Sequence, residues 1–348
     1  MAIQNTPVSV PSAVEVRPYQ ELWRLVTGCL ISQAIHVAAK LDIAGLLKDG
    51  PKSSTELAQA TATHAPSLYR LLRALASIGV FAEDEQARFE LTPLAELLQK
   101  DVPGSLHAGA LFIGSVFQWP PLGELIYSIQ TGEPSFNHLF GMDIWEYNNH
   151  HPEAHDLFHY AMSSFSAVEI NAILSAYDFS TARTIIDVAG GHGTLLAAIL
   201  NAYPNIQGIL FDLPQVIQQA EPVLKAAGVE QRCTITAGDM FTSIPAEGDI
   251  YMMKTVLHDW DDDHSVAILQ VCQAAMPAHA KLLLMTRVVA PGNTPDFSKF
   301  MDLNMLISME GKERTSAEFE ALLDAAGLTL SRIIPTRSPL SIIECIKC

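Results

Sequence analysis

The chain has 348 residues, of which 49% are hydrophobic, and carries a formal net charge of −17. This length and composition can supply the cores of two domains. The acidic balance argues against nucleic acid or an anionic membrane as the main partner, because binding to phosphates depends on clustered Lys and Arg. No apolar run reaches membrane-spanning length, and the N-terminus lacks the basic-then-apolar pattern of a signal peptide, so we expect a cytoplasmic protein.

The cysteines and histidines do not follow the spacing of a metal site. Cys345 and Cys348 lie at the extreme C-terminus with no second cysteine pair elsewhere, which favours reduced thiols over a structural zinc. His155 and His159 are spaced i, i+4, but no Glu follows the first histidine as an HExxH site requires. We expect no bound metal and interpret these histidines as a polar helix face or a pocket wall.

Residues 1–100 predict a helical domain with a small wing. The weakly interrupted apolar residues of 18–40 indicate a helix buried on more than one side. Residues 53–56, Ser-Ser-Thr-Glu, carry a capping signature, and leucines recur at helical period after Pro66. Residues 80–92 alternate like a two-stranded wing. Together these elements predict a winged helix.

A winged helix raises the alternative of a DNA-binding regulator. Its recognition helix would carry only Arg70 and Arg73 as basic residues, and the wing tip holds Glu83, Asp84 and Glu85. These acids would repel phosphate, so we expect no nucleic-acid partner.

A three-glycine turn at residues 190–193 follows the apolar run of residues 184–188. A buried parallel strand that leads into a glycine loop and then a helix is where an α/β sheet holds a nucleoside-bearing cofactor. A dinucleotide suits this loop poorly, because Leu196 stands where glycine or alanine is needed and Asp187 would repel a pyrophosphate. A positively charged, phosphate-free nucleoside such as S-adenosylmethionine fits better.

Acidic and polar residues also follow the next expected strands. Asp212 would accept hydrogen bonds from ribose hydroxyls, Asp239 would lie near an adenine amino group, and Met240 would pack against the ring. Lys254 and then His258 with Asp259 come after a fourth strand. These residues gather at one edge, as expected for the ligand crevice of an open α/β sheet.

From about residue 15 to its C-terminus, the chain resembles the plant-type small-molecule O-methyltransferases, which include caffeic acid O-methyltransferase. The resemblance rests on Asp-Val-x-Gly-Gly-x-Gly, Phe-Asp-Leu-Pro, Gly-Asp-Met-Phe, Leu-His-Asp-Trp and Gly-Lys-Glu-Arg-Thr, in that order. It implies an α/β fold: a Rossmann-like class I methyltransferase domain over residues 181–348, with its last strand inserted antiparallel. It also implies an N-terminal α-helical winged-helix domain that forms a homodimer, and a helical linker over residues 101–180 that lines the substrate pocket.

The resemblance implies contacts for S-adenosylmethionine. The loop at Gly190 would hold the amino-acid moiety and Asp212 the ribose, while Asp239 and Met240 would hold adenine, with Lys254 beside them. Ser163 is a further cofactor candidate. Asp187 is either a buried residue that orders the loop or a direct electrostatic partner. Ala189 replaces the first glycine of the commoner family pattern, which is tolerated if its φ is negative.

The methyl acceptor implied is a small aromatic or polyketide-type compound. The family lines its pocket with the helix that matches Phe158, Met162 and Phe165, and we add Asn304 and Met305 as substrate contacts. An apolar slot suits a flat ring. Oxygen, nitrogen and carboxylate acceptors all stay open.

The catalytic residues implied are His258, Glu313 and Asp259. A neutral imidazole has the basicity to take a proton from a hydroxyl near neutral pH, so His258 would be the general base. Glu313 would orient the imidazole and stabilise its charged form. The alternatives are a histidine that caps the helix beginning near residues 261–263, and a Glu313 that pairs with its neighbours or caps the helix after it.

One residue departs from the family pattern. Thr286 stands where a second carboxylate is expected, and threonine cannot stabilise a charged imidazole. We therefore expect a weaker base or a more acidic acceptor, such as a hydroxyquinone or an enol. The departure also leaves open the alternative that the protein is a relative that binds S-adenosylmethionine but catalyses cyclisation, elimination or hydroxylation.

Overall fold

The computed structural model describes residues 16–348, which divide into two compact units between Ser115 and Val116. The predicted helical linker over residues 101–180 contributes helices to both units.

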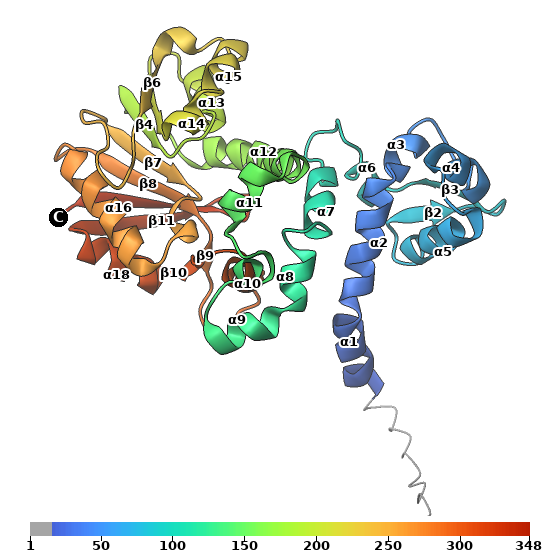
Figure 1. Ribbon diagram of the computed structural model, residues 1–348. Helices are drawn as coiled ribbons and strands as arrows, with labels where there is room; N and C mark the ends of the chain where they lie inside the picture. The colour runs from blue at the N-terminus through green and yellow to red at the C-terminus, as the bar shows by residue number, and fades with distance from the viewer. Residues whose placement is uncertain (1–15) are drawn as a thin grey trace, which may run out of the picture. The chain divides into compact units, whose positions relative to one another are not determined.

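The first unit contains seven described helices and a small sheet (Figure 1). The helices are α1 (Val16–Val26), α2 (Gly28–Lys40), α3 (Ile43–Leu47), α4 (Ser54–Thr61), α5 (Ala65–Ala76), α6 (Pro93–Glu96) and α7 (His107–Ile113). The strands β1 (Lys52–Ser53), β2 (Phe81–Glu83) and β3 (Arg88–Leu91) form a sheet in the order β1-β3-β2. The predicted wing is therefore confirmed as β2 and β3.

Local sequence explains how this unit folds. Ser53 and Glu56 form a complete capping box at the start of α4, as predicted. The leucines of α5 bury one face, and Leu72 is fully buried in a core shared with Leu57 and Phe89. The helices packed on this core, together with the β2-β3 wing, form the predicted winged helix.

The prediction of a single helix over residues 18–40 is wrong, because the structure divides this segment into α1 and α2. The helix breaks at Thr27, whose hydroxyl donates to the Trp23 carbonyl at 2.7 Å, and the two parts bend by 43°. Leu22 and Leu30 are more than 60% exposed in the single chain. Apolar patterning reports that a face is suited to burial, but burial on both sides would need a second chain.

The second unit contains a large sheet flanked by helices. Its strands are β4 (Thr184–Val188), β5 (Gln207–Asp212), β6 (Cys233–Ala237), β7 (Ile250–Lys254), β8 (Lys281–Thr286), β11 (Leu328–Pro335) and β12 (Ser341–Lys347), and a separate pair is β9 (Val288–Val289) with β10 (Arg314–Thr315). Its longer helices are α12 (Pro152–Ala176), α13 (Thr194–Ala202), α16 (Asp262–Ala275), α17 (Ser298–Ser308) and α18 (Ser316–Ala325). The shorter ones are α8 (Trp119–Gly123), α9 (Leu125–Thr131), α10 (Ser135–Phe140), α11 (Ile144–His150), α14 (Pro214–Ile217) and α15 (Ala220–Ala226), with 3₁₀ turns η1 (Glu230–Arg232) and η2 (Leu257–Asp259).

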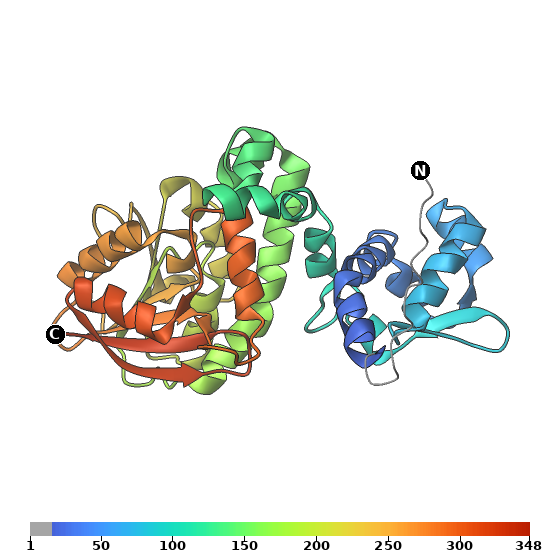
Figure 2. The same ribbon diagram turned by 90° about the horizontal axis from the view of Figure 1, so that it is seen from below.

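The strand order is β11-β12-β8-β7-β4-β5-β6. Strands β4 to β8 run parallel, and β12 lies antiparallel between β8 and β11, where Figure 2 draws both late strands in red. The predicted mixed sheet with an inserted antiparallel strand is confirmed. Because the carboxyl ends of β4, β5, β6 and β7 meet at one edge, this topology defines where a ligand can bind.

Helices cover both faces of the sheet (Figure 1). Successive strand residues alternate between two cores: Ile185 joins the core under α12 and α13, whereas Ile186 joins the core under α16 and α18. Both residues are fully buried, so the central strands read as continuous apolar runs rather than alternating ones.

A buried carboxylate fixes the C-terminal end of α12 to the sheet. Glu344 of β12 accepts a 2.7 Å hydrogen bond from the Tyr177 hydroxyl and pairs with Lys281 and Arg332. These cationic and hydroxyl donors overcome the cost of burial and lower the pKa of Glu344 to about 2. The carboxylate is therefore ionised at neutral pH.

Among residues 16–348, no single helix is long and apolar enough to cross a bilayer. The bent pair α1 and α2 would together be long and apolar enough, by length and composition alone. All five cysteines are free thiols.

Candidate active site

The loop after β4 uses left-handed backbone at three positions. Ala189, Gly191 and Gly193 have φ values of 54°, 61° and 80°. The condition of a negative φ at Ala189 is therefore not met, and this residue stores backbone strain that glycine would avoid. Gly190 is required for a different reason, because a Cβ there would lie 2.5 Å from the Asp187 carboxyl carbon.

Asp187 ends β4 as a buried and incompletely paired carboxylate. Its side chain is 2% exposed, and its Oδ2 has no hydrogen-bond partner among the described residues. Burial raises the pKa of Asp187 to about 7, with Lys254 opposing and Asp212 adding to the rise. An unpaired carboxylate oxygen of this kind favours a cationic ligand over a purely structural role.

Asp187 faces a cavity of about 230 Å³ between the glycine loop and α12. Several of the predicted residues line this cavity together, although they come from distant parts of the chain. The lining residues are Met162, Ser163, Ser166, Ile170, Asp187, Ala189, Gly190, Gly191, His192, Thr194, Leu195, Lys254 and Thr255. Met162, predicted to contact the acceptor, thus shares a cavity with Ser163 and Gly190, predicted to contact the cofactor.

Asp212 lies at the end of β5, next to this loop. Its Oδ2 accepts from the Gly191 backbone N–H at 2.8 Å, and its Oδ1 accepts from the Leu213 N–H at 2.7 Å. Burial raises the pKa of Asp212 above its usual value, although these two hydrogen bonds act to lower it. The residue therefore fixes the glycine loop to the neighbouring strand.

Asp239 and Met240 follow β6, one strand further along the sheet. The Asp239 Oδ1 accepts from the Phe241 N–H at 2.9 Å, and Met240 packs beside Phe241 against the core under α16. Both residues therefore lie at the carboxyl end of β6, which is the edge of the sheet where they were expected.

Lys254 does not lie beside Asp239 and Met240 as expected. It ends β7, which β4 and β5 separate from β6. Its Nζ donates to Glu169 at 2.8 Å and to Ser166 at 3.1 Å, both on α12. The Glu169 carboxylate compensates the buried charge of Lys254. Lys254 therefore joins α12 to the sheet beside the cavity that Asp187 lines.

The residues present fit S-adenosylmethionine. Its ammonium group matches the unpaired Asp187 oxygen, its hydroxyls match Asp212, and the missing Cβ at Gly190 allows close approach of the ligand to the backbone. No group of three or more His, Cys, Asp or Glu suited to a metal ion occurs within residues 16–348.

A second cluster of titratable residues follows β7. The His258 Nδ1 lies 3.2 Å from Glu313 Oε1, and its Nε2 lies 3.3 Å from Asp259 Oδ1. The His258 side chain is 16% exposed and that of Glu313 only 1% exposed. The three predicted catalytic residues are therefore in contact, and the imidazole lies between two carboxylates.

The net effect of this environment is a higher basicity of His258. Burial disfavours the charged imidazole, but the Asp259 carboxylate and the hydrogen bond to Glu313 outweigh it and raise the pKa of His258. Arg287 acts in the opposite direction. Asp259 thus supplies a second carboxylate to the imidazole although Thr286 does not, and the weaker base or more acidic acceptor expected from Thr286 stays a prediction.

Arg287 joins the cluster through the small β9-β10 pair. Val288 lies opposite Arg314 in this parallel pair, which brings the two preceding residues, Arg287 and Glu313, side by side. The Arg287 Nη1 lies 3.4 Å from Glu313 Oε1, the same oxygen that contacts His258. Thr286 itself is 5% exposed at the end of β8.

The structural alternatives for His258 and Glu313 are wrong. Asp261 is the N-cap of α16 and accepts from the His264 N–H at 2.8 Å. Thr315 and Glu318 form the capping box of α18. Neither His258 nor Glu313 caps these helices.

The neighbours of Glu313 are also engaged elsewhere. Lys312 and Arg314 both pair with Asp262, so Glu313 is not their partner.

The predicted acceptor contacts lie on two helices. Phe158 is buried on α12, with its ring centroid 5.7 Å from that of Phe117 and also from that of Trp145, while Phe165 is half-buried. Asn304 and Met305 lie on α17, close in sequence to Asp302, which accepts from the Glu313 N–H at 2.9 Å.

Sequence reasoning missed four residues that organise these clusters. Glu169 pairs with Lys254, and Arg287 pairs with Glu313. The sequence offered one signal for Glu169, which is a single charged residue in the largely apolar C-terminal half of α12. Gly311 and Arg314 belong to the quoted Gly-Lys-Glu-Arg-Thr motif, but their contacts with the segment after β7 depend on tertiary structure.

Two family models match the chain. The O-methyltransferase domain matches residues 122–329, and the O-methyltransferase dimerisation domain matches residues 23–101. The chain belongs to the O-methyltransferase family. It is an S-adenosylmethionine-dependent methyltransferase, as the loop and the motif order predict.

Curated relatives match nearly the whole methyltransferase. A phenazine O-methyltransferase, PhzM of Lysobacter antibioticus, is 44% identical and aligns over 93% of this chain and 94% of its own. The mitomycin biosynthesis 6-O-methyltransferase of Streptomyces lavendulae is 37% identical over 99% of both chains. An 8-amino-8-demethylriboflavin N,N-dimethyltransferase of Streptomyces davaonensis is 32% identical over 94% of both chains.

A solved structure supports the same fold. CalO1, a methyltransferase in calicheamicin biosynthesis crystallised with S-adenosylhomocysteine bound, superposes with a TM-score of 0.87 at 35% identity. The alignment covers 96% of this chain and 99% of that one.

The charges around His258 can be tested with two variants that should shift its pKa in opposite directions. In the wild type, histidine-labelled NMR titration should place the pKa of His258 above its ordinary value of 6.5. Asp259→Asn removes an attraction for the charged imidazole and should lower this pKa. Arg287→Gln removes a repulsion and should raise it.

The exposed Asp263 lies in the same segment, and Asp263→Asn, which makes the same charge change, should leave the pKa of His258 near its wild-type position. Shifts of equal sign in Asp259→Asn and Arg287→Gln would contradict this account.

Proposed function

We propose that the methyltransferase transfers its methyl group to a hydroxyl, phenolic or enolic, of a small aromatic or polyketide-type secondary metabolite, with His258 as general base. The observation that carries the proposal is the imidazole held between Glu313 and Asp259 at the end of β7. This is the edge of the sheet that also holds the Asp187 cavity.

Each catalytic residue has a distinct role in this proposal. The donor supplies an electrophilic methyl group on a sulfonium. His258 would accept the hydroxyl proton at Nε2 as the hydroxyl oxygen takes the methyl group, and the electrons of the broken C–S bond would stay on the sulfur of the product S-adenosylhomocysteine. Glu313 accepts from Nδ1–H and so holds the tautomer in which Nε2 can receive a proton. Asp259 stabilises the imidazolium that results.

The choice of oxygen over nitrogen rests on this chemistry. An attacking hydroxyl must lose a proton as it becomes an ether, so a buried imidazole flanked by carboxylates is useful. Two relatives described above are named as O-methyltransferases, whereas a third acts on an amino group. Methyl transfer is also favoured over cyclisation, elimination or hydroxylation, because His258, Asp259 and Glu313 are all present.

The cofactor contacts follow from the unpaired oxygen of Asp187 and from the strand-end positions of the other residues. Asp187 would accept from the ammonium group and Asp212 from the ribose hydroxyls, with Asp239 and Met240 at the adenine end of the edge. Gly190, Ser163 and Lys254 line the cavity that would hold the amino-acid end.

Replacing the base tests the catalytic assignment. His258→Ala should lower turnover by about 10²–10⁴-fold, with S-adenosylhomocysteine affinity by calorimetry close to that of the wild type. Glu313→Ala should cost less, because Nε2 remains present. Formation of S-adenosylhomocysteine would be measured on the best acceptor from a panel of hydroxyphenazines, phenols and dihydroxynaphthoates.

Losses that are trivial or equal in the two variants would refute these roles. Asp263→Asn serves as the matched control and should retain full turnover.

The raised pKa of Asp187 makes donor binding dependent on pH. An ammonium group stabilises the ionised carboxylate, so binding should release a proton, and affinity for S-adenosylmethionine should rise between about pH 6 and pH 7. Calorimetry in buffers of different ionisation enthalpy measures this release. Asp187→Asn should bind more weakly and show no such dependence, while pH-independent binding by the wild type would count against the assignment.

We also propose that the protein acts as a homodimer through its N-terminal unit. The match to a dimerisation domain over residues 23–101 supports this. So does the exposed apolar face of α1 and α2, where Trp23 is 58% and Leu30 69% exposed. Such a contiguous apolar face is characteristic of an interface. A cytoplasmic location is a further proposal, supported by the five free thiols.

The dimer proposal can be tested by multi-angle light scattering. The double variant Trp23→Glu with Leu30→Glu places charges on the apolar face and should be monomeric where the wild type is dimeric. Ile78 is exposed in the turn after α5, and Ile78→Glu should remain dimeric. A dimeric double variant would exclude this face as the interface.

A further inference from the structure

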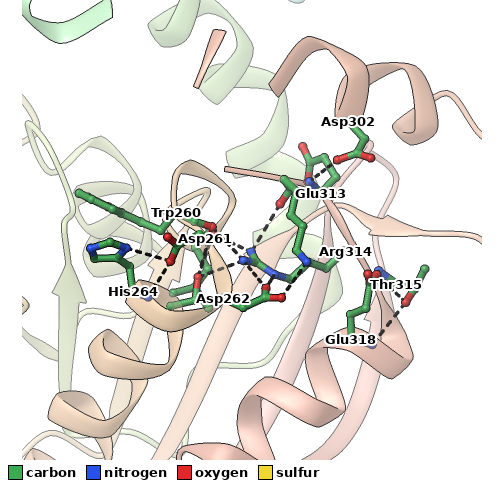
Figure 3. A network of polar contacts seen from close by, with 12 residues as sticks. Trp260, Asp261, Asp262, His264, Asp302, Glu313, Arg314, Thr315 and Glu318 are labelled. Carbon is green, nitrogen blue, oxygen red and sulfur yellow. Dashed lines mark hydrogen bonds and ion pairs between the residues drawn. The ribbon is translucent and has the colours of Figure 1, made fainter. Parts of the chain in front are cut away.

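Arg314 is fully buried and joins the two segments that carry the catalytic pair (Figure 3). Its Nη1 donates to the Leu257 carbonyl and its Nη2 to the Trp260 carbonyl, each at 2.8 Å. These two residues stand on either side of His258 and Asp259. Arg314 therefore fixes both ends of the turn that carries the imidazole, and it is itself adjacent to Glu313 in the chain.

The other Arg314 contacts hold the guanidinium plane in one orientation. Its Nε donates to Asp262 at 3.0 Å and its Nη2 to the Ser265 hydroxyl at 3.2 Å, both at the start of α16. The Asp262 side chain is 53% exposed, so it compensates the buried charge only in part. Burying a charged residue is costly, and a packed apolar residue of the same size is often as stable.

Gly311 brings the same two segments together from the other side. A Cβ at this position would lie 1.9 Å from the His258 carbonyl oxygen and 2.5 Å from the Asp259 carbonyl carbon. Gly311 does not have a positive φ, so its backbone would accept alanine. Glycine is therefore required by the backbone contact with His258.

A third contact fixes Glu313 itself. Its backbone N–H donates to the Asp302 Oδ1 at 2.9 Å, and Figure 3 shows Asp302 on the far side of Glu313 from Arg314. The turn at residues 257–260 and the segment at residues 311–315 thus form one assembly. Small movements between them would change the distance from Nδ1 to Oε1 directly.

We propose that Arg314 and Gly311 are positioning residues that set the contact between His258 and Glu313. The inference rests on the proposed function, because it concerns the geometry of the proposed base. Arg314 acts through its planar set of donors, which binds two carbonyls and a carboxylate at once; a lysine ammonium has the charge but not this geometry. Gly311 acts by allowing backbone contact.

Arg314→Lys tests this role against a merely structural one. The pKa of His258, followed by NMR, should fall toward its ordinary value, because the loosened turn weakens the bond to Glu313. Turnover on the best acceptor of the panel should fall by about 100-fold, the loss expected from a misplacement of about 1 Å. S-adenosylhomocysteine affinity should stay within about threefold of wild type, because the cavity residues are unchanged.

Arg232→Lys is the matched control. Arg232 also donates to backbone carbonyls, those of Leu200, Tyr203 and Ile206, but it lies at the opposite end of the sheet from His258. It should lower the melting temperature and leave both the pKa of His258 and turnover unchanged. Equal behaviour of Arg314→Lys and Arg232→Lys would overturn the proposal.

Gly311→Ala provides a second test if the arginine variant does not fold. It should lower the pKa of His258 and turnover in the same direction as Arg314→Lys, while Gly123→Ala, which meets no atom within 4 Å, should change neither. An unchanged pKa in Gly311→Ala would overturn the positioning role. Retained turnover in His258→Ala would instead refute the base assignment, and the pKa measurements would still decide the positioning role.

Discussion

The contact between His258 Nδ1 and Glu313 Oε1 joins two segments that are 55 residues apart in the chain. The turn after β7 supplies the imidazole, and the segment before α18 supplies the carboxylate. The parallel pairing of β9 with β10 makes this meeting possible, because it brings Glu313 to the end of β8, which neighbours β7 in the sheet. The hydrogen bonds of Arg314 and the backbone contact of Gly311 then restrict how the two segments can move.

Charge is distributed unevenly along this edge. The Asp187 cavity has a buried carboxylate, Asp187, whose second oxygen is unpaired, and a lysine, Lys254, that is paired with Glu169. The cluster after β7 has an imidazole between two carboxylates, with Arg287 as the opposing charge. Such an acidic environment would favour both a cationic methyl donor and the imidazolium of the proposed mechanism.

Much of the fold follows from local patterns. The glycine turn, the capping box at Ser53 and the continuous apolar strands were sufficient to predict the sheet and the winged helix, because each depends on neighbours in the sequence. Predictions failed where the environment comes from elsewhere. The left-handed Ala189 depends on the path of its loop, and the partner of Lys254 depends on which helix crosses β7.

The amino-acid sequence alone determined the strand-end residues Asp187, Asp212 and His258, because periodicity and turn residues show where a buried strand ends and which side chains follow it. Tertiary structure decided which side chains these residues meet and in which direction their pKa values shift. The pairing of Val288 with Arg314 places Arg287 on Glu313, and the order of the strands separates Lys254 from Asp239. Such long-range contacts are set by sheet order and packing, which leave no local pattern in the chain.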